Sequence, residues 1–399
     1  MHRPPLSLFT ALAVAALCAS TAAADQDSVY RLFIGDHADG MVRAIDLADG
    51  SEIASFAIDQ TPALTRSTSG RTIFAVQGDA GKIAVIDTGI AFEDHGDHRD
   101  LIVSDARLLD TEITGTRPAH VVEGSGRIAV FDDGTGDVTV FGESDLLGDN
   151  FAPTTLSPGA AHHGLAAPMG DYLVISVPDA DPEQPRLGLR VIGIDGSDAG
   201  DIMPCPGVHG QAQSARVFAF GCRDGVVLAT PAEGGNPPAL THLPTGELGE
   251  GHVSTLKGGT SLQFFLGNFG ADAMVIIEPD SDAPFRRVDL PTRRVDFVLD
   301  PVRAQNAYIL TEDGQLHLLN ILTGQITQSL QATGPYSMDG HWRDPRPRLA
   351  VAGDHIAITD PATGTIRLIA TDPMTEAREI VVEGTPYTIV AVGGSGAVH

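Results

Sequence analysis

The segment Arg127–Phe131 reads RIAVF, and a few residues later Asp137–Phe141 reads DVTVF. Both runs are short, apolar and rich in β-branched or aromatic side chains, and the residues between them are Asp, Gly and Thr. Such a pair predicts two antiparallel strands joined by a turn. The arrangement recurs at Thr72–Val76 with Lys82–Ile86, at Tyr172–Val177 with Leu189–Ile194, and at Ala307–Leu310 with Leu316–Leu319.

These hairpins belong to a repeat of about 45 residues with four strands per unit, which is typical of a β-propeller blade. Complete units start near Ala63, Ala119, His163, His209, His252, Val295 and Arg348. One more unit is split between the chain ends, with its innermost strand at Tyr387–Val392 and its outer strands at Tyr30–Ile34, Met41–Leu47 and Glu52–Ile58. Closing the ring with strands from both termini removes the free sheet edge that an open array exposes.

We therefore predict an all-β fold, a single β-propeller of eight blades, or of seven if one short unit is not a blade. A two-domain β-sandwich is the structural alternative, but no Pro/Ser-rich or charge-rich linker interrupts the repeat. The longest irregular stretch, Ile90–Arg107, lies inside the first complete blade and is too short for a domain linker.

The N-terminus has the pattern of a secretory signal peptide. A positive charge at Arg3 precedes the uncharged apolar run Leu6–Leu17, and Ala22–Ala24 offers a cleavage site. We expect residues 1–24 to be removed and residues 25–399 to form the propeller domain of a soluble periplasmic protein. A lipoprotein anchor at Cys18 is the alternative, but Leu17 stands where such signals require a small residue.

The charge of the chain excludes two classes of partner. It carries 52 acidic and 25 basic side chains, a formal net charge of −27. Such a surface repels phosphate backbones and anionic lipids. We therefore expect no nucleic-acid partner and no membrane insertion.

Cleavage after Ala24 leaves two cysteines, Cys205 and Cys222. In an oxidising compartment, two cysteines on neighbouring predicted strands favour a disulfide. Two unpaired buried cysteines are the alternative.

Histidines recur at one phase of the repeat, the connection that leaves one blade and starts the innermost strand of the next. They are His120, His163, His209, His252 and His341. The first four belong to consecutive blades, and these connections share one face of a propeller, so their imidazoles can converge at the channel. Neutral imidazole suits zinc, and three or four at about 2.0–2.1 Å make a tetrahedral site without a thiol. The alternative is a set of structural histidines that satisfy backbone groups.

A second group of candidate ligands lies in the long loop, where Glu93–Asp100 reads EDHGDHRD. We predict metal contact there through His95, Asp97, His98 and Asp100. The alternative is a solvated acidic loop that contains histidines. Strand counting places this loop on the face away from the other histidines, and whether the two groups share one ion stays open.

The export signal, the repeat, the His-Gly-Asp-His-x-Asp loop and the Pro-Ala-His, His-His-Gly and His-Gly motifs at blade starts together resemble the AztD-type periplasmic zinc chaperones. The resemblance covers essentially the whole mature chain. It implies that the protein holds Zn²⁺ and passes it to the solute-binding protein of a zinc ABC transporter. The ligands that it implies are His95, Asp97, His98, Asp100, His120, His163, His209 and His252.

Two other classes of function compete with this one. Propellers serve as lactonases and haem-bearing reductases, but the blade starts here are richer in His than in the carboxylates of a lactonase calcium site. The chain has no C-x-x-C-H haem motif and no G-x-S-x-G elbow. A protein-binding scaffold with incidental histidines is the third class.

Overall fold

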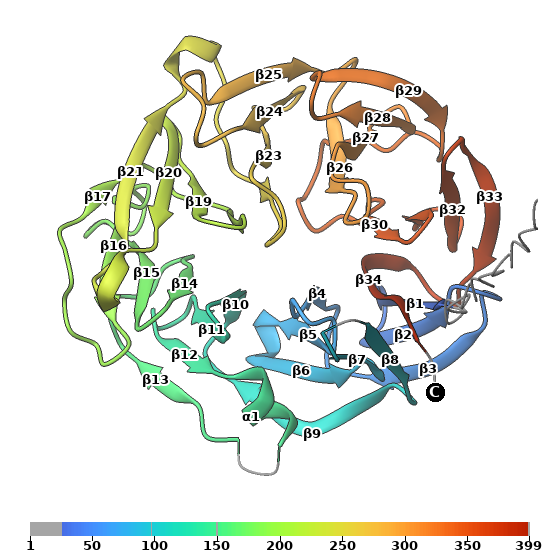
Figure 1. Ribbon diagram of the computed structural model, residues 1–399, viewed down its shortest axis with the longest axis horizontal. Coiled ribbons are helices and arrows are strands. Elements are labelled where there is room, and N and C mark those ends of the chain that lie inside the picture. Colours follow the sequence, from blue (N-terminus) through green and yellow to red (C-terminus); the bar gives the residue numbers. More distant parts are fainter. Residues whose placement is uncertain (1–25, 97, 149–150, 398–399) are drawn as a thin grey trace, which may run out of the picture.

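The protein is a ring of antiparallel four-stranded blades around a central channel (Figure 1). This computed structural model describes residues 26–96, 98–148 and 151–397. The predicted eight blades are confirmed, with one sheet for each repeat unit. The predicted signal peptide and Asp97 lie outside the described residues.

The strands of each blade follow one another from the channel outward. The first complete blades are β4 (Ala63–Arg66), β5 (Thr72–Gln77), β6 (Lys82–Asp87) and β9 (Arg107–Thr114), then β10 (Pro118–Gly124), β11 (Arg127–Asp132), β12 (Val138–Phe141) and β13 (Thr154–Leu156). The next are β14 (Ala166–Met169), β15 (Tyr172–Val177), β16 (Gly188–Gly193) and β17 (Met203–Pro204), then β18 (Gln211–Gln213), β19 (Phe218–Gly221), β20 (Gly225–Thr230) and β21 (Ala239–Pro244). The fifth complete blade consists of β22 (Leu256–Lys257), β23 (Phe265–Asn268), β24 (Ala273–Ile277) and β25 (Phe285–Asp289). The sixth consists of β26 (Arg294–Leu299), β27 (Asn306–Thr311), β28 (Gln315–Asn320) and β29 (Gln325–Gln331). The seventh consists of β30 (Leu349–Ala352), β31 (His355–Asp360), β32 (Thr365–Thr371) and β33 (Met374–Val381).

The ring is closed by strands from both ends of the chain, as the sequence predicts. The innermost strand β34 (Pro386–Ala397) pairs antiparallel with β1 (Gln26–Asp36), which is followed outward by β2 (Met41–Asp46) and β3 (Glu52–Ala57). The central residues of this seam are buried, so the closure is part of the hydrophobic core rather than a loose contact.

The stretch predicted to be irregular, Ile90–Arg107, instead contains a hairpin of β7 (Ile90–Asp94) and β8 (Arg99–Val103). This hairpin extends the closing blade, because β8 pairs with β34 at Asp100 and Ala397. Ile90 and Leu101 are buried in the core between this blade and the next. Each strand has only three consecutive apolar residues, and the charged residues gather at the hairpin tip, so the sequence gives only a weak strand signal here.

The hydrophobic core lies mostly between adjacent blades. The second and third strands of each unit carry nearly continuous buried runs, and β5 is buried along its whole length. The outermost strands β9 and β29 alternate half-buried with exposed side chains because one of their faces meets solvent. The predicted disulfide is present between Cys205 and Cys222, with an S–S distance of 2.01 Å.

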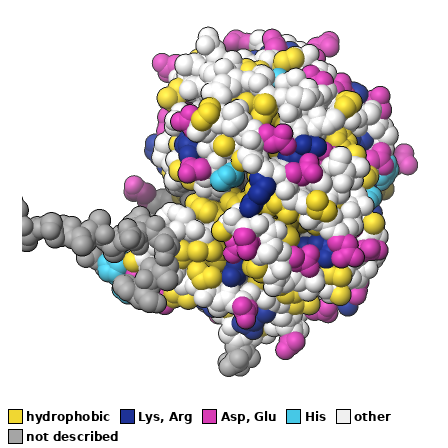
Figure 2. All heavy atoms as spheres, turned by 90° about the vertical axis from the view of Figure 1, so that its right-hand side faces the viewer, with side chains coloured by type: hydrophobic (Ala, Val, Ile, Leu, Met, Phe, Trp, Pro, Cys, Tyr) yellow, Lys and Arg dark blue, Asp and Glu magenta, His cyan; other side chains and the backbone are white. Residues whose placement is uncertain are grey.

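One side of the ring carries its surface charges in a scattered distribution (Figure 2). On the side of the ring drawn in Figure 2, acidic side chains lie among apolar and basic ones and do not gather in one patch. The short helix α1 (Glu143–Leu147) and the single turns η1 (Gly78–Ala80), η2 (Glu233–Gly235) and η3 (Gly246–Leu248) complete the described secondary structure. Within these residues, no helix has the length and apolar character needed to cross a membrane.

Candidate metal centre

Three consecutive blades bring three of the predicted histidines together at one end of the channel. His120 lies at the start of β10, and His163 and His209 lie in the connections just before β14 and β18. The Nε2 atom of His163 is 3.3 Å from Nε2 of His120 and 3.3 Å from Nε2 of His209. One nitrogen from each ring lies within 4.8 Å of the other two, so a single ion can contact all three.

In His163 and His209, the Nδ1 atom contacts a protein oxygen, which leaves Nε2 available to bind a metal. The Nδ1 atom of His209 donates to the backbone oxygen of Ser254 at 2.8 Å, because a carbonyl can only accept. The Nδ1 atom of His163 lies 2.6 Å from a carboxylate oxygen of Asp133. Partners of this kind fix the ring orientation and the tautomer of histidines that bind metals. Both rings therefore present an Nε2 lone pair to the cluster.

The surroundings of the cluster favour neutral imidazoles. Burial lowers the pKa of His120 to about 4, and the neighbouring His163 and His209 act in the same direction. Burial also lowers the pKa of His209. Because a metal binds the neutral ring, this environment keeps His120 ready for a cation near neutral pH.

An arginine holds two of the ligand-bearing connections together. Arg186 donates from Nε to the backbone oxygen of Val208 at 2.6 Å and from Nη1 to the backbone oxygen of His163 at 2.7 Å. Its own carbonyl accepts from the Gly207 N–H at 2.8 Å. The backbone positions of the His163 and His209 connections are therefore coupled through one planar guanidinium.

The disulfide supports the same region. It joins the connection before His209 to the β19–β20 turn, and the N–H of His209 donates to the backbone oxygen of Gly221 at 3.0 Å. Cys222 also lies near Asp224 and His242 in a group with metal-ligand spacing. Since Cys222 is in the disulfide, this group lacks a free thiolate, the form of cysteine that binds a metal.

The other histidines at blade starts do not join the cluster. His252 is exposed and is not a member of the three-imidazole group. His162 has both ring nitrogens in hydrogen bonds, to the Ala160 carbonyl and to the Ser176 hydroxyl, which is a structural arrangement.

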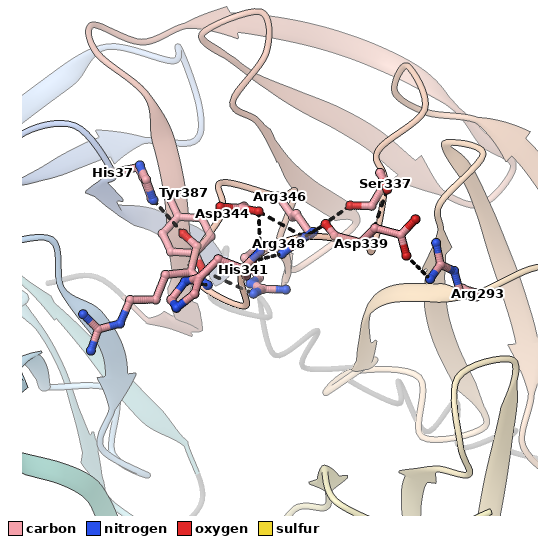
Figure 3. Close-up of polar contacts among 10 residues, drawn as sticks. His37, Arg293, Ser337, Asp339, His341, Asp344, Arg346, Arg348 and Tyr387 are labelled. Atoms are coloured by element: carbon pink, nitrogen blue, oxygen red, sulfur yellow. Dashed lines mark hydrogen bonds and ion pairs between the residues drawn. The ribbon is translucent and has the colours of Figure 1, made fainter.

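His341 belongs to a long segment, residues 333–348, that precedes β30 (Figure 3). Arg346 organises this segment by donating to the backbone oxygens of Ser337, Asp339 and His341. The Nδ1 atom of His341 accepts from the Arg343 N–H at 3.1 Å, so one ring nitrogen serves the loop itself. His341 is outside the three-imidazole group.

The second predicted group lies at the tip of the β7–β8 hairpin. The Nε2 atom of His95 is 3.1 Å from one carboxylate oxygen of Asp100, and Nε2 of His98 is 3.4 Å from the other. The two imidazole rings stack with centroids 5.2 Å apart. Two imidazoles and a carboxylate thus converge at the tip, and the described residues supply three of the four predicted ligands.

The two groups occupy opposite ends of the blades. The start of β10 pairs with the end of β11, which places His120 at one end. In the preceding blade, the end of β6 pairs with the start of β5, at the other end from the start of β4. The hairpin follows β6 directly, so His95 and His98 lie away from the three-imidazole cluster, as strand counting predicts.

Sequence reasoning missed the residues that support the cluster. Asp133, Arg186 and Ser254 come from connections 30, 23 and 45 residues away from the histidines that they contact. Asp133 stands in the turn that follows β11, at the same end of the blade as the histidines. This position in the repeat is the one signal in the sequence that links Asp133 to the site.

Fold and site together define a β-propeller with a candidate histidine metal centre. No family model matches the chain. The zinc chaperone AztD of Citrobacter koseri is 44% identical over 402 aligned positions, which cover 100% of this chain and 95% of the relative. The chain belongs to the AztD family of zinc chaperones.

Solved structures agree with this assignment. The crystal structure of Citrobacter koseri AztD has a TM-score of 0.91 and 45% identity, covering 94% of this chain and 100% of the other. The apo structure of the same protein has a TM-score of 0.88 and 44% identity, covering 92% and 99%. A propeller enzyme, the dihydro-heme d1 dehydrogenase NirN, is only 11% identical with a TM-score of 0.59, so it shares the fold alone. The close relative is a zinc chaperone and not an enzyme.

Proposed function

We propose that the protein is a periplasmic zinc metallochaperone that holds Zn²⁺ through His120, His163 and His209 and transfers it to the solute-binding protein of a zinc ABC transporter. The observation that carries the proposal is the convergence of three Nε2 atoms within 4.8 Å. Membership of a zinc chaperone family supports zinc as the cargo.

The chemistry of the cluster suits a carrier. Three imidazoles leave the fourth tetrahedral position of zinc for water or for a ligand from an acceptor. The side chain of His163 is 46% exposed, so an incoming ligand can approach the ion from solvent. Transfer then proceeds by stepwise ligand exchange without release of free zinc.

The hairpin provides a second candidate site, formed by His95, His98 and Asp100, with Asp97 as a further predicted ligand. This site stands on a hairpin added to the inner edge of the closing blade, whereas the cluster is built into three blades. We therefore assign the holding role to the cluster. His252 stays a predicted ligand, because it lies in the equivalent connection of the next blade.

Export is part of the proposal. The predicted signal peptide, residues 1–24, and the disulfide Cys205–Cys222 both fit a periplasmic protein, because disulfides persist in oxidising compartments. The proposed partner is the zinc-binding solute-binding protein, with no nucleic-acid partner and no membrane insertion.

The deciding experiment measures the rate of zinc transfer against acceptor concentration. Direct hand-over predicts a transfer rate that exceeds the rate of zinc release to a chelator, because donor and acceptor share the ion in a complex. The variant His163→Ala should lose transfer, and His355→Ala, at the start of β31, is the control. A rate that saturates at the spontaneous release rate would leave zinc storage as the function.

A further inference from the structure

A cavity of about 830 Å³ opens at the end of the ring opposite the three-imidazole cluster. The β4–β5 turn, helix α1 and strand β34 contribute to its wall, and so do Ala91, Phe92 and Arg99 of the β7–β8 hairpin. Its volume falls within the range of about 300–1,000 Å³ that is usual for small-molecule sites.

Three arginines, Arg66, Arg71 and Arg99, line this cavity. Within residues 26–96, 98–148 and 151–397, no ion pair joins any of the three to a carboxylate. Other exposed arginines of this acidic chain do have such partners, as Arg216 has in Asp280 and Arg190 in Asp198. Three arginines without an ion-pair partner among the described residues therefore line one cavity, where a ligand can reach them.

Two of the guanidinium groups flank the closing strand. A Cβ atom added at Gly70 would lie 3.8 Å from Arg66 Nη1 and 3.9 Å from Val392 Cβ. Arg99 donates from Nη2 to the backbone oxygen of Ser395 at 3.1 Å, and its guanidinium lies 4.1 Å from the centroid of the Phe92 ring. The two cations thus face the same cavity across a few residues of β34.

The wall also contains one carboxylate, Glu143, which is already engaged. Its oxygens accept hydrogen bonds from the Ser69 hydroxyl at 2.8 and 3.0 Å and from the Thr72 hydroxyl at 2.6 Å. Three arginines and one glutamate give the lining a formal charge of 3 − 1 = +2. The charged residues that line the cavity are therefore mainly positive, although the whole chain carries a net charge of −27.

We propose that this cavity binds a small organic anion that carries carboxylate or phosphate groups. The guanidinium fork matches the oxygens of both groups, and several cations around one cavity are stabilised when an anion occupies it. The rings of Tyr30 and Phe92 supply apolar surface for the carbon part of the ligand. This site is distinct from the proposed zinc cargo site at the other end of the ring.

Calorimetric titration of the zinc-free mature protein tests the proposal. The probes are citrate for carboxylate, glycerol 3-phosphate for phosphate and glycerol as the neutral comparison. We expect at least one of the two anions to bind and glycerol not to bind. The variants Arg66→Gln and Arg71→Gln should each lower the affinity for that anion at least about tenfold. The anion that binds identifies the group that the cavity recognises.

The control variant is Arg216→Gln, which removes an exposed guanidinium from an ion pair elsewhere and should leave anion binding unchanged. Circular dichroism and thermal melting confirm that each variant is folded. Absence of binding by both anions overturns the proposal. Equal affinity of wild type, Arg66→Gln and Arg71→Gln overturns it as well.

Discussion

Two groups of histidines lie at opposite ends of the propeller, and the protein holds them in different ways. His120, His163 and His209 come from three blades; Arg186 and Asp133 join their connections, and the disulfide supports the connection of His209. His95 and His98 share one hairpin tip, where both contact the carboxylate of Asp100. The cluster is thus preorganised by the ring, whereas the hairpin group depends on one local turn.

This difference in preorganisation predicts which of the two histidine groups binds zinc more tightly. A site whose ligands are fixed before binding loses less conformational entropy when the ion arrives, so it binds more tightly for the same ligands. Imidazoles on a short hairpin are ordered by fewer contacts. We therefore expect the three-imidazole cluster to bind zinc more tightly than the hairpin group.

Loss of a ligand from the cluster should have the largest effect. We expect His163→Ala to weaken the tightest zinc site by roughly 100-fold or more, because a four-ligand zinc site distributes its binding free energy over few bonds. The double variant His95→Ala/His98→Ala should leave that affinity within about twofold. Competition titration with a zinc chelator measures both, and the reverse ranking would assign the holding role to the hairpin.

Removal of the acidic partner of His163 should have the next largest effect. Asp133→Asn keeps the size of the side chain but removes the charge that contacts Nδ1 at 2.6 Å. Partners of metal-bound histidines contribute about 10–100-fold to affinity, so we expect a loss in that range. Asp224→Asn, which alters the contact of His242, is the matched control. An unchanged zinc affinity would show that Asp133 does not orient the ligand.

A smaller loss should follow from Arg186→Lys. Lysine keeps the positive charge, so the change tests only the two hydrogen bonds that couple the His163 and His209 connections. We expect zinc affinity to fall by about 3–10-fold, because one ammonium cannot reproduce the planar fork. The same chelator titration applies, and tighter zinc binding by Arg186→Lys would contradict a coupling role.

The smallest expected effect is on the thermal stability of the zinc-free protein as the pH is lowered. The pKa of His120 is about 4 in the folded state, against 6.5 for a free side chain. Between these values the unfolded chain binds a proton that the folded chain does not, so the free energy of unfolding falls as pH falls through this window. We expect wild type to lose about 2 °C more in Tm than His120→Gln between pH 7 and pH 4.5. Parallel melting curves for the two proteins would refute this assignment.

The sequence predicts the ring of blades well because the repeat can be recognised in the sequence of every blade. Strands such as Arg127–Asp132 are runs of buried apolar residues, and turn residues bound them on both sides. The same phase argument finds His120, His163 and His209. It also selects His252, which follows Gly251 at a φ of +150° and is exposed instead of joining the cluster. The path of a connection depends on such backbone angles, which the pattern of the repeat does not encode.

The support of the site is harder to predict for a related reason. Arg186 and Asp133 contact the cluster through the packing of neighbouring blades, and neither belongs to a histidine motif. The β7–β8 hairpin was not predicted because each strand has only five residues, of which three are apolar and two are charged. Local composition therefore predicts the elements, while contacts between blades decide how a site is held.

The most direct test of the central claim is the position of zinc in crystals of the protein loaded with one equivalent of the ion. An anomalous difference map at the zinc edge locates the metal without reference to the ligands. Our account predicts the main peak at about 2.0–2.1 Å from Nε2 of His120, His163 and His209. A main peak at the β7–β8 hairpin, with none among the three imidazoles, would contradict it.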